Sequence, residues 1–295
     1  MTGSNVDRKP FQTGILLALL ASFMFSLKPI IIKQVYELGV GSEELMILRM
    51  WFALPFYAFM LFLQRKVLLE KRRYLLSVMA IGFLGYFLSS YLDLIALQTI
   101  SASTERIILY AYPSLVIIIK ALYDKKLPTK RTLVALLTVY AGILILLPGE
   151  LNVEGAGVGI MLMFICALTF AFYVILSKPL INRMGVGVFT STAMVSSCLF
   201  TQIHFVHVEI NDVLSFPMEI YGLALALAFF STVIPSYAMS AAIALIGAEK
   251  VAITGTTGPA FTVLFAVLIL GEAFSVYHAA GLSLVITGVF LLSKR

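Results

Sequence analysis

The feature that most constrains this chain is a series of apolar stretches, each about 20 residues long, that recur from one end to the other. A helical stretch of that length crosses a hydrocarbon core about 30 Å thick. Hydrophobic residues make up 61% of the 295 residues and charged residues only 12%, whereas soluble domains carry about 25% charged residues. We therefore expect an integral membrane protein, and we expect helical spans, because backbone polar groups in lipid need internal partners.

Ten transmembrane helices are predicted. They cover residues 12–34, 44–63, 74–97, 101–122, 131–147, 157–177, 187–207, 219–243, 249–270 and 276–293.

The basic residues of the loops predict the orientation of these spans. Lys and Arg collect in segments on the same side as the N-terminus, whereas the opposite side holds only Lys33, at the end of the first predicted span. Cytoplasmic loops retain Lys and Arg, so we expect both termini in the cytoplasm. The membrane itself is expected to be a bacterial inner (plasma) membrane. This distribution explains the net charge of +6 without a nucleic acid partner.

The chain also aligns with itself when it is shifted by 146 residues. The shift matches prolines, glycines and a Ser-Tyr pair: Pro113 with Pro259, Gly142 with Gly288, and Ser90-Tyr91 with Ser236-Tyr237. We predict two five-helix repeats, residues 1–149 and 150–295, that form one transport unit. Because five is odd, the second repeat enters the membrane from the opposite side, so the predicted fold is all-α with two inverted repeats.

A resemblance to a known family rests on these same features. The five-plus-five pattern, Pro113 and Pro259, the run Leu270-Gly271-Glu272, and Gly281 with Gly288 resemble the EamA branch of the drug/metabolite transporter superfamily. The Gly-Glu element occurs only in the second half, because the matching stretch of the first half reads Asp124-Lys125-Lys126. The resemblance implies a secondary transporter that exports an amino acid or related metabolite by alternating access around a central cavity.

Five charged residues inside the first four spans are the strongest site candidates. A charge within a span costs about 2.5–3.5 kcal/mol on insertion scales, so it usually faces a bundle interior or a water-filled cavity. Their repeat mates are neutral, so the fold alone does not require them. Three cations and two carboxylates leave one positive charge for a substrate carboxylate or another anion. These residues are Lys28, Arg49, Asp93, Glu105 and Arg106.

Other interpretations of the five charges stay open. They also suit a structural ion-pair network, and Arg49 and Arg106, near helix ends, also suit snorkelling to the interface. Asp93 and Glu105 are placed to bind a coupling proton, although pairing with Lys or Arg would favour their ionised forms.

Tyrosines and hydroxyl groups are predicted to complete the pocket, with interfacial anchoring as the alternative for the tyrosines. These candidates are Tyr91, Tyr110, Tyr173, Ser236, Tyr237 and Thr256. Helix-breaking residues are predicted as hinges, with tolerated kinks as the alternative. They are Pro113, Pro235, Gly258 and Pro259.

Other function classes have less support. The chain contains no HExxH, GxSxG or phosphate-loop motif, so we expect no enzyme, cofactor or metal. A carrier of organic cations, drugs or nucleosides is the alternative within transport, and a channel or a membrane scaffold is the alternative outside it. We expect a small-molecule substrate, the lipid bilayer and a monomer or homodimer, with proton coupling undecided.

Overall fold

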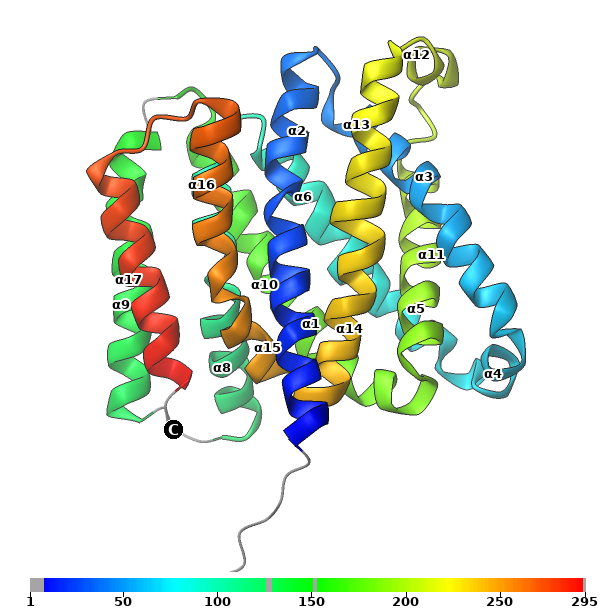
Figure 1. Cartoon of the computed structure of the whole chain (residues 1–295), viewed down its shortest axis with the longest axis horizontal. Helices are drawn as coiled ribbons and strands as arrows, with labels where there is room; N and C mark the ends of the chain where they lie inside the picture. Colours follow the sequence, from blue (N-terminus) through cyan, green and yellow to red (C-terminus); the bar gives the residue numbers. More distant parts are fainter. Residues whose placement is uncertain (1–7, 126–128, 151–152, 294–295) are drawn as a thin grey trace, which may run out of the picture.

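The computed structural model describes residues 8–125, 129–150 and 153–293, and this part of the chain is helical with connecting turns and contains no strand. Most of the helices run alongside one another in a bundle (Figure 1). Within the described residues, eight helices are long and apolar enough to cross a membrane. They are Lys9–Glu37, Ser42–Leu63, Arg72–Ala96, Ala102–Tyr123, Ala156–Met184, Val186–His204, Met218–Ile246 and Ala248–Leu270.

The first half contains five predicted spans, several of them built from more than one helical segment. They are α1 (Arg8–Ser26) with α2 (Lys28–Glu37); α3 (Ser42–Leu63), followed by the short α4 (Arg65–Glu70); η1 (Arg72–Tyr74), α5 (Leu75–Gly82), η2 (Phe83–Leu88) and α6 (Ser89–Ala96); α7 (Ala102–Leu109) with α8 (Tyr112–Tyr123); and α9 (Lys130–Glu150).

The second half repeats this order. It contains α10 (Ala156–Met184); α11 (Val186–His204), followed by the short α12 (Ile210–Leu214); α13 (Met218–Ala228), η3 (Phe229–Val233) and α14 (Ile234–Ile246); α15 (Ala248–Thr254), η4 (Gly255–Thr257) and α16 (Gly258–Leu270); and α17 (Val276–Ser293).

The helical content confirms the all-α class, but the number of spans is confirmed only in part. The fifth and tenth predicted spans are helical as α9 and α17, yet neither is among the eight membrane-length helices, and the apolar part of α17 counts as a shorter helix, Val276–Leu291. Ten membrane crossings therefore stay a prediction.

Local irregularities recur at equivalent places in the two halves. The wide π-helical turns η2 and η3 begin at Phe83 and Phe229, which are 146 residues apart, the same shift that aligns the sequence. The break between α7 and α8 likewise corresponds to η4. These matches support two repeats, while their boundary at residues 149 and 150 stays a prediction.

The predicted hinge residues lie at helix breaks. Pro113, Pro235 and Pro259 occupy the first turns of α8, α14 and α16, and Gly258 begins α16. Proline has no N–H to donate and its fixed φ suits a helix start, so each proline begins a new segment inside a span. A hinge motion at these breaks stays a prediction.

Helices α9 and α17 pack against each other at one side of the bundle (Figure 1). The matched glycines lie in this contact. A Cβ on Gly142 would lie 2.8 Å from the carbonyl oxygen of Gly281, and a Cβ on Gly288 would lie 2.8 Å from the carbonyl oxygen of Ala135. The repeat-matched glycines thus allow two helix backbones to approach closely.

Replacing Gly288 by Ala is expected to destabilise the protein, because the new methyl group would meet the backbone of α9, which cannot rotate away. Overpacking of this kind costs about 1–3 kcal/mol. The measurement is the thermal unfolding midpoint of the detergent-solubilised protein. Gly222→Ala is the matched control, because a Cβ there meets nothing within 4 Å. Equal midpoints for both variants would contradict this description of the α9–α17 contact.

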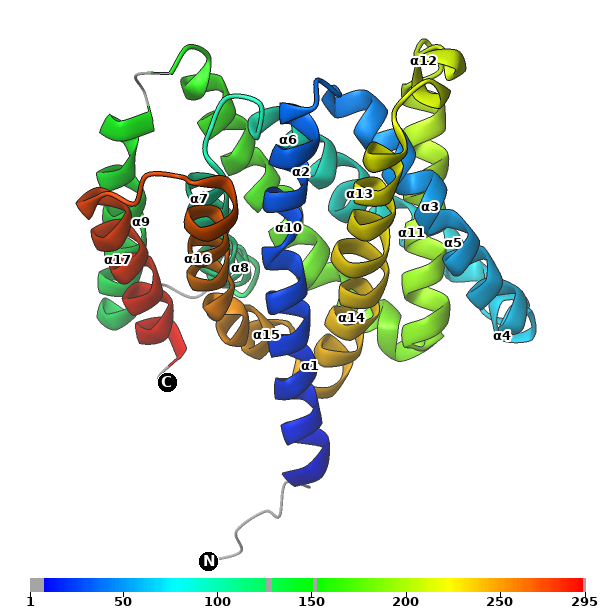
Figure 2. The ribbon, with the colours of Figure 1, turned by 45° about the horizontal axis from the view of Figure 1, so that its top comes forward.

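The two ends of the described chain lie at the same end of the bundle. Helix α1 begins and α17 ends at the lower end in Figures 1 and 2, and α4 also lies low, whereas α12 lies at the upper end. This arrangement agrees with a chain whose termini share one side of the membrane. That this side is the cytoplasm stays a prediction from the basic loops.

Candidate functional site

A cavity of about 100 Å³ lies near the centre of the bundle and is lined by both halves. A water molecule needs about 10–15 Å³ of such space, so the cavity holds several waters or the polar part of a small metabolite. Its walls come from the first four spans of each half. The fifth spans, α9 and α17, contribute no lining residue.

The charged wall of the cavity comes entirely from the first half. Lys28, Arg49, Asp93 and Arg106 line it. Lys28 Nζ lies 2.5 Å from Asp93 Oδ2, and the Asp93 side chain is almost fully buried. Lys28 stands at the start of α2, directly after the break at Leu27, which places its ammonium group at the cavity. This pair joins the first span to the third.

Arg106 is held by two groups. Its Nη2 donates a hydrogen bond to the carbonyl oxygen of Phe25 at 2.8 Å, and its Nε lies 3.3 Å from Glu105 Oε2. Phe25 is near the end of α1, where the break before α2 leaves this carbonyl available. Arg106 therefore has both a carboxylate and a backbone partner.

Arg49 differs from the other two cations. It is only 2% exposed, and its Nε has no hydrogen-bond partner among the described residues. Its Nη2 contacts the sulfur of Met46 at 2.8 Å, a weak acceptor. No carboxylate in the described part of the chain forms an ion pair with it. The surplus positive charge of the site is therefore the Arg49 guanidinium.

Glu105 lies behind the charged wall rather than on it. The side chain is 0% exposed and is not a lining residue. Neither of its carboxylate oxygens accepts a hydrogen bond from the described residues, although Asp93 lies close enough to interact with it. Its ion pair is the one with its chain neighbour Arg106.

The opposite wall comes from the second half and is mostly apolar, with the hydroxyl groups of Ser231 and Thr232 as its polar members. Phe170, Met194, Met239 and Val251 line it. Three of these residues are repeat mates of charged ones: Met239 of Asp93 and Val251 of Glu105 at the 146-residue shift, and Met194 of Arg49 at the 145-residue shift that aligns the first part of the chain. The first half thus contributes the charges that line the cavity, and the equivalent positions of the second half contribute thioether and hydrocarbon groups.

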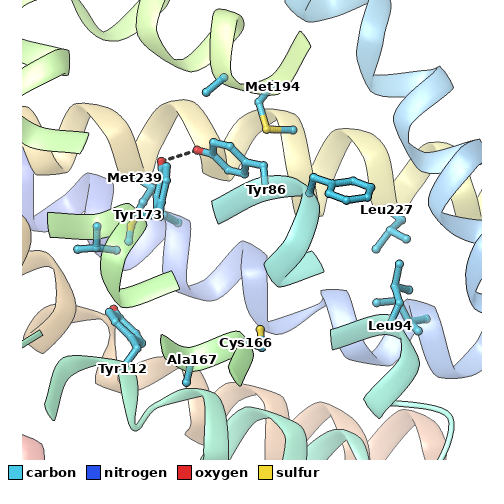
Figure 3. Close-up of a cluster of buried hydrophobic side chains, with 14 of the residues drawn as sticks. Tyr86, Leu94, Tyr112, Cys166, Ala167, Tyr173, Met194, Leu227 and Met239 are labelled. Atoms are coloured by element: carbon cyan, nitrogen blue, oxygen red, sulfur yellow. Dashed lines mark hydrogen bonds between the residues drawn. The ribbon is translucent and has the colours of Figure 1, made fainter. Parts of the chain in front are cut away.

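Aromatic residues connect the two walls. Tyr86 of η2 lines the cavity, and its hydroxyl group forms a 2.6 Å hydrogen bond with the hydroxyl of Tyr173 from α10. Figure 3 shows this bond, with Met194 and Met239 close to the two rings. Gly85 allows this approach, because a Cβ there would collide with the Tyr173 ring.

The structure brings part of the predicted site together. Of the candidates, Lys28, Arg49, Asp93, Arg106 and Tyr110 line the cavity. The remaining six are not among its lining residues. They are Tyr91, Glu105, Tyr173, Ser236, Tyr237 and Thr256.

All six have other contacts, and those of Glu105 and Tyr173 are given above. Tyr91 packs against the rings of His204 and Phe205. The Ser236 hydroxyl bonds to Tyr57, the Tyr237 hydroxyl bonds to Ser191, and Thr256 Oγ1 donates to the carbonyl of Ile253. The contacts of Tyr91, Ser236 and Tyr237 therefore tie helices together in this conformation, whereas that of Thr256 stays within its own span. Whether any of them meets a substrate stays a prediction.

Sequence reasoning missed Ser22, which lines the cavity from α1. Its Oγ donates to the carbonyl of Gly255 at 2.8 Å and bonds to the Tyr110 hydroxyl at 3.1 Å. Gly255 begins the break in the ninth span, so Ser22 satisfies a carbonyl near a point where the helix is irregular. The sequence carries no signal for this role beyond a small polar residue in an apolar span.

Comparisons with known proteins agree with this architecture. A sequence model of the EamA-like transporter family matches residues 12–147 and 157–294, which fits two repeats. The uncharacterized transporter YcbK of Bacillus subtilis (strain 168) is 29% identical over 288 residues, covering 94% of this chain and 92% of YcbK. A chain of known crystal structure, 15% identical, matches over 96% of both chains with a TM-score of 0.70, a likeness of fold alone.

Proposed function

We propose, since the chain belongs to the EamA-like transporter family, that this multi-pass membrane transporter carries amino acids or related metabolites that bear a carboxylate. The family model and the name of the relative point to a transporter. The amino-acid class follows from the family resemblance together with the cavity, and the mechanism is inferred from the two repeats.

The observation that carries the proposal is the buried Arg49 guanidinium without a carboxylate partner. Burying an unpaired charge costs several kcal/mol, so a fold retains one where a ligand compensates it. The planar guanidinium fork matches a carboxylate through two parallel hydrogen bonds. A substrate carboxylate is therefore the complementary group for this position.

The opposite wall indicates the rest of the substrate. Phe170, Met194, Met239 and Val251 offer apolar and polarisable surface, and Met adapts to ligands of different shape. A carboxylate at Arg49 directs the remainder of a small molecule toward this wall. Amino acids with apolar side chains fit both walls, whereas an organic cation would meet Arg49 as a like charge.

Alternating access is the mechanism that two inverted repeats favour, because exchanging the conformations of the halves opens the cavity to the other side. The helix breaks before Pro113 and Pro259 provide places where backbone angles can change. We propose export as the direction, as the family resemblance implies. Glu105 is the better of the two acids for a coupling proton, because its ion pair with Arg106 is longer, at 3.3 Å, than the 2.5 Å pair of Asp93 with Lys28.

Counterflow in proteoliposomes tests the proposal. Vesicles are preloaded with separate pools of L-amino acids, nucleosides, organic acids or cationic drugs, and uptake of the matching labelled pool is followed. Saturable exchange of amino acids, strongest for those with apolar side chains, is the expected result. Exchange confined to cationic drugs or nucleosides would contradict the proposed substrate class. A conductance without saturable exchange would indicate a channel.

A further inference from the structure

Glu272 connects the second half of the chain to the first. Its Oε1 accepts a hydrogen bond from the backbone N–H of Ala102 at 2.7 Å. Its Oε2 accepts two more from Ser103, from the backbone N–H at 3.2 Å and from Oγ at 2.7 Å. The first N–H groups of a helix have no carbonyl partner within that helix, and the helix dipole favours an anion there. Glu272 therefore clamps the first turn of α7.

The backbone conformation before Glu272 places its carboxylate at the N-terminus of α7. Gly271 ends α16 in the left-handed conformation, with φ at +67°, which glycine adopts without the steric cost that a side chain would bring. The chain then turns away from the helix axis and carries Glu272 to α7, which packs against α16. The run Leu270-Gly271-Glu272 thus ends α16 and joins it to the first turn of α7.

Helix α7 needs such a clamp more than a long helix would. It has eight residues and ends at Leu109, and the break at Tyr110 and Ala111 separates it from α8. A continuous helix therefore does not fix its orientation. One turn after the clamp, α7 carries Glu105 and Arg106, and Arg106 lines the cavity. A small tilt of α7 would move the Arg106 guanidinium away from the charged wall.

In the second repeat, the helix equivalent to α7 lacks counterparts of the Glu105 and Arg106 charges. The mate of α7 is α15, which carries Val251 and Ala252 where α7 carries Glu105 and Arg106. The mate of Glu272 is Lys126, which lies outside the described residues and has no carboxylate to offer. Among the described residues, the ion pair at α15 is Lys120 with Glu249, at 3.9 Å between an exposed and a partly buried side chain. The carboxylate clamp therefore accompanies the half that has the charges.

We propose that Glu272 is a positioning residue for transport: by clamping the N-terminus of α7, it holds Arg106 at the wall of the cavity. The proposal rests on the proposed function, because it assigns Arg106 a place in substrate binding. Glu272 itself does not line the cavity and acts through α7.

The test compares Glu272→Gln with the wild type in counterflow of a fixed mixture of labelled L-amino acids. A single amide oxygen cannot accept all three hydrogen bonds, and the charge at the helix terminus is lost. We expect the half-saturating concentration of the mixture to rise about tenfold. Glu219→Gln, the same change at an exposed position on α13, is the matched control and should leave it unchanged.

A second variant removes the donor instead of the acceptor. Ala102→Pro deletes the N–H that bonds to Glu272 at the first position of α7, where proline is a favoured residue. Ser101 already has the extended backbone that a following proline requires. The half-saturating concentration should rise in this variant too, by a smaller factor. In an Arg106→Lys background, the effect of Glu272→Gln should shrink, because both changes act through the same guanidinium.

The outcomes separate the clamp from the proposed function. An unchanged half-saturating concentration, or a loss confined to folded yield and maximal rate, would overturn the positioning role. If the wild type shows no amino-acid counterflow, the proposed function fails, and hydrogen–deuterium exchange of α7 in the reconstituted proteins still decides whether the clamp exists. Faster exchange at Ala102 and Ser103 in Glu272→Gln would support it, and equal exchange would refute it.

Discussion

Replacing Arg49 by Met is expected to lower amino-acid counterflow by at least about 100-fold while raising the thermal stability of the substrate-free protein. Removing one partner of a buried charge pair costs about 2–5 kcal/mol in binding, and a 100-fold loss corresponds to about 3 kcal/mol. Without substrate, the guanidinium is a buried charge with no carboxylate partner, so an apolar side chain of similar length relieves its desolvation cost.

Two measurements on the same preparations check the opposite effects expected for Arg49→Met: counterflow should fall, and the thermal unfolding midpoint should rise. Arg131→Met, at an exposed position on α9, is the control for removing a positive charge. Arg49→Lys should recover only part of the transport, because an ammonium group cannot form the two parallel bonds of the guanidinium fork. Normal transport with a lower midpoint in Arg49→Met would instead indicate a structural ion-pair network.

The second large effect is expected for Asp93→Asn, which should lower the free energy of unfolding by about 3 kcal/mol or more. The change leaves the Lys28 ammonium group without its carboxylate partner in a largely buried position. Combining it with Lys28→Met should restore most of the lost stability, because neither charge then remains unpaired. Thermal unfolding of the single and double variants is the measurement.

Lys120→Gln is the matched control for Asp93→Asn. It breaks the ion pair with Glu249, whose atoms are 3.9 Å apart at the surface of the described structure. Exposed pairs contribute about 0–1 kcal/mol, so the unfolding midpoint should hardly move. If Asp93→Asn were as mild as Lys120→Gln, the Lys28–Asp93 pair would not be the stabilising contact that its 2.5 Å distance indicates.

Much of the fold could be predicted because lipid imposes it. Apolar stretches of about 20 residues indicate helices without any knowledge of packing, and the 146-residue shift exposes the repeat. The π-helical turns at Phe83 and Phe229 could not be predicted, because they arise where a helix adjusts to its neighbours rather than from a local residue pattern.

The charged lining of the cavity was predictable to the extent that charge in a membrane is costly. Lys28, Arg49, Asp93 and Arg106 were found by this criterion, and all four line the cavity. The sequence could not tell which cation lacks a partner, because that depends on distances between helices. Hydroxyl residues were predicted less well: Ser22 was missed and Thr256 bonds to its own helix, because small polar residues satisfy themselves locally as easily as they face a cavity.

Inhibition of counterflow by two matched mixtures tests the central claim most directly, because they differ only in the carboxylate. One contains L-amino acids with apolar side chains, and the other contains the corresponding amino-acid amides. Recognition at Arg49 predicts that the acids inhibit uptake of the labelled amino acids and that the amides require a concentration about 100-fold higher. Equal inhibition by both mixtures would contradict recognition of a carboxylate in this cavity.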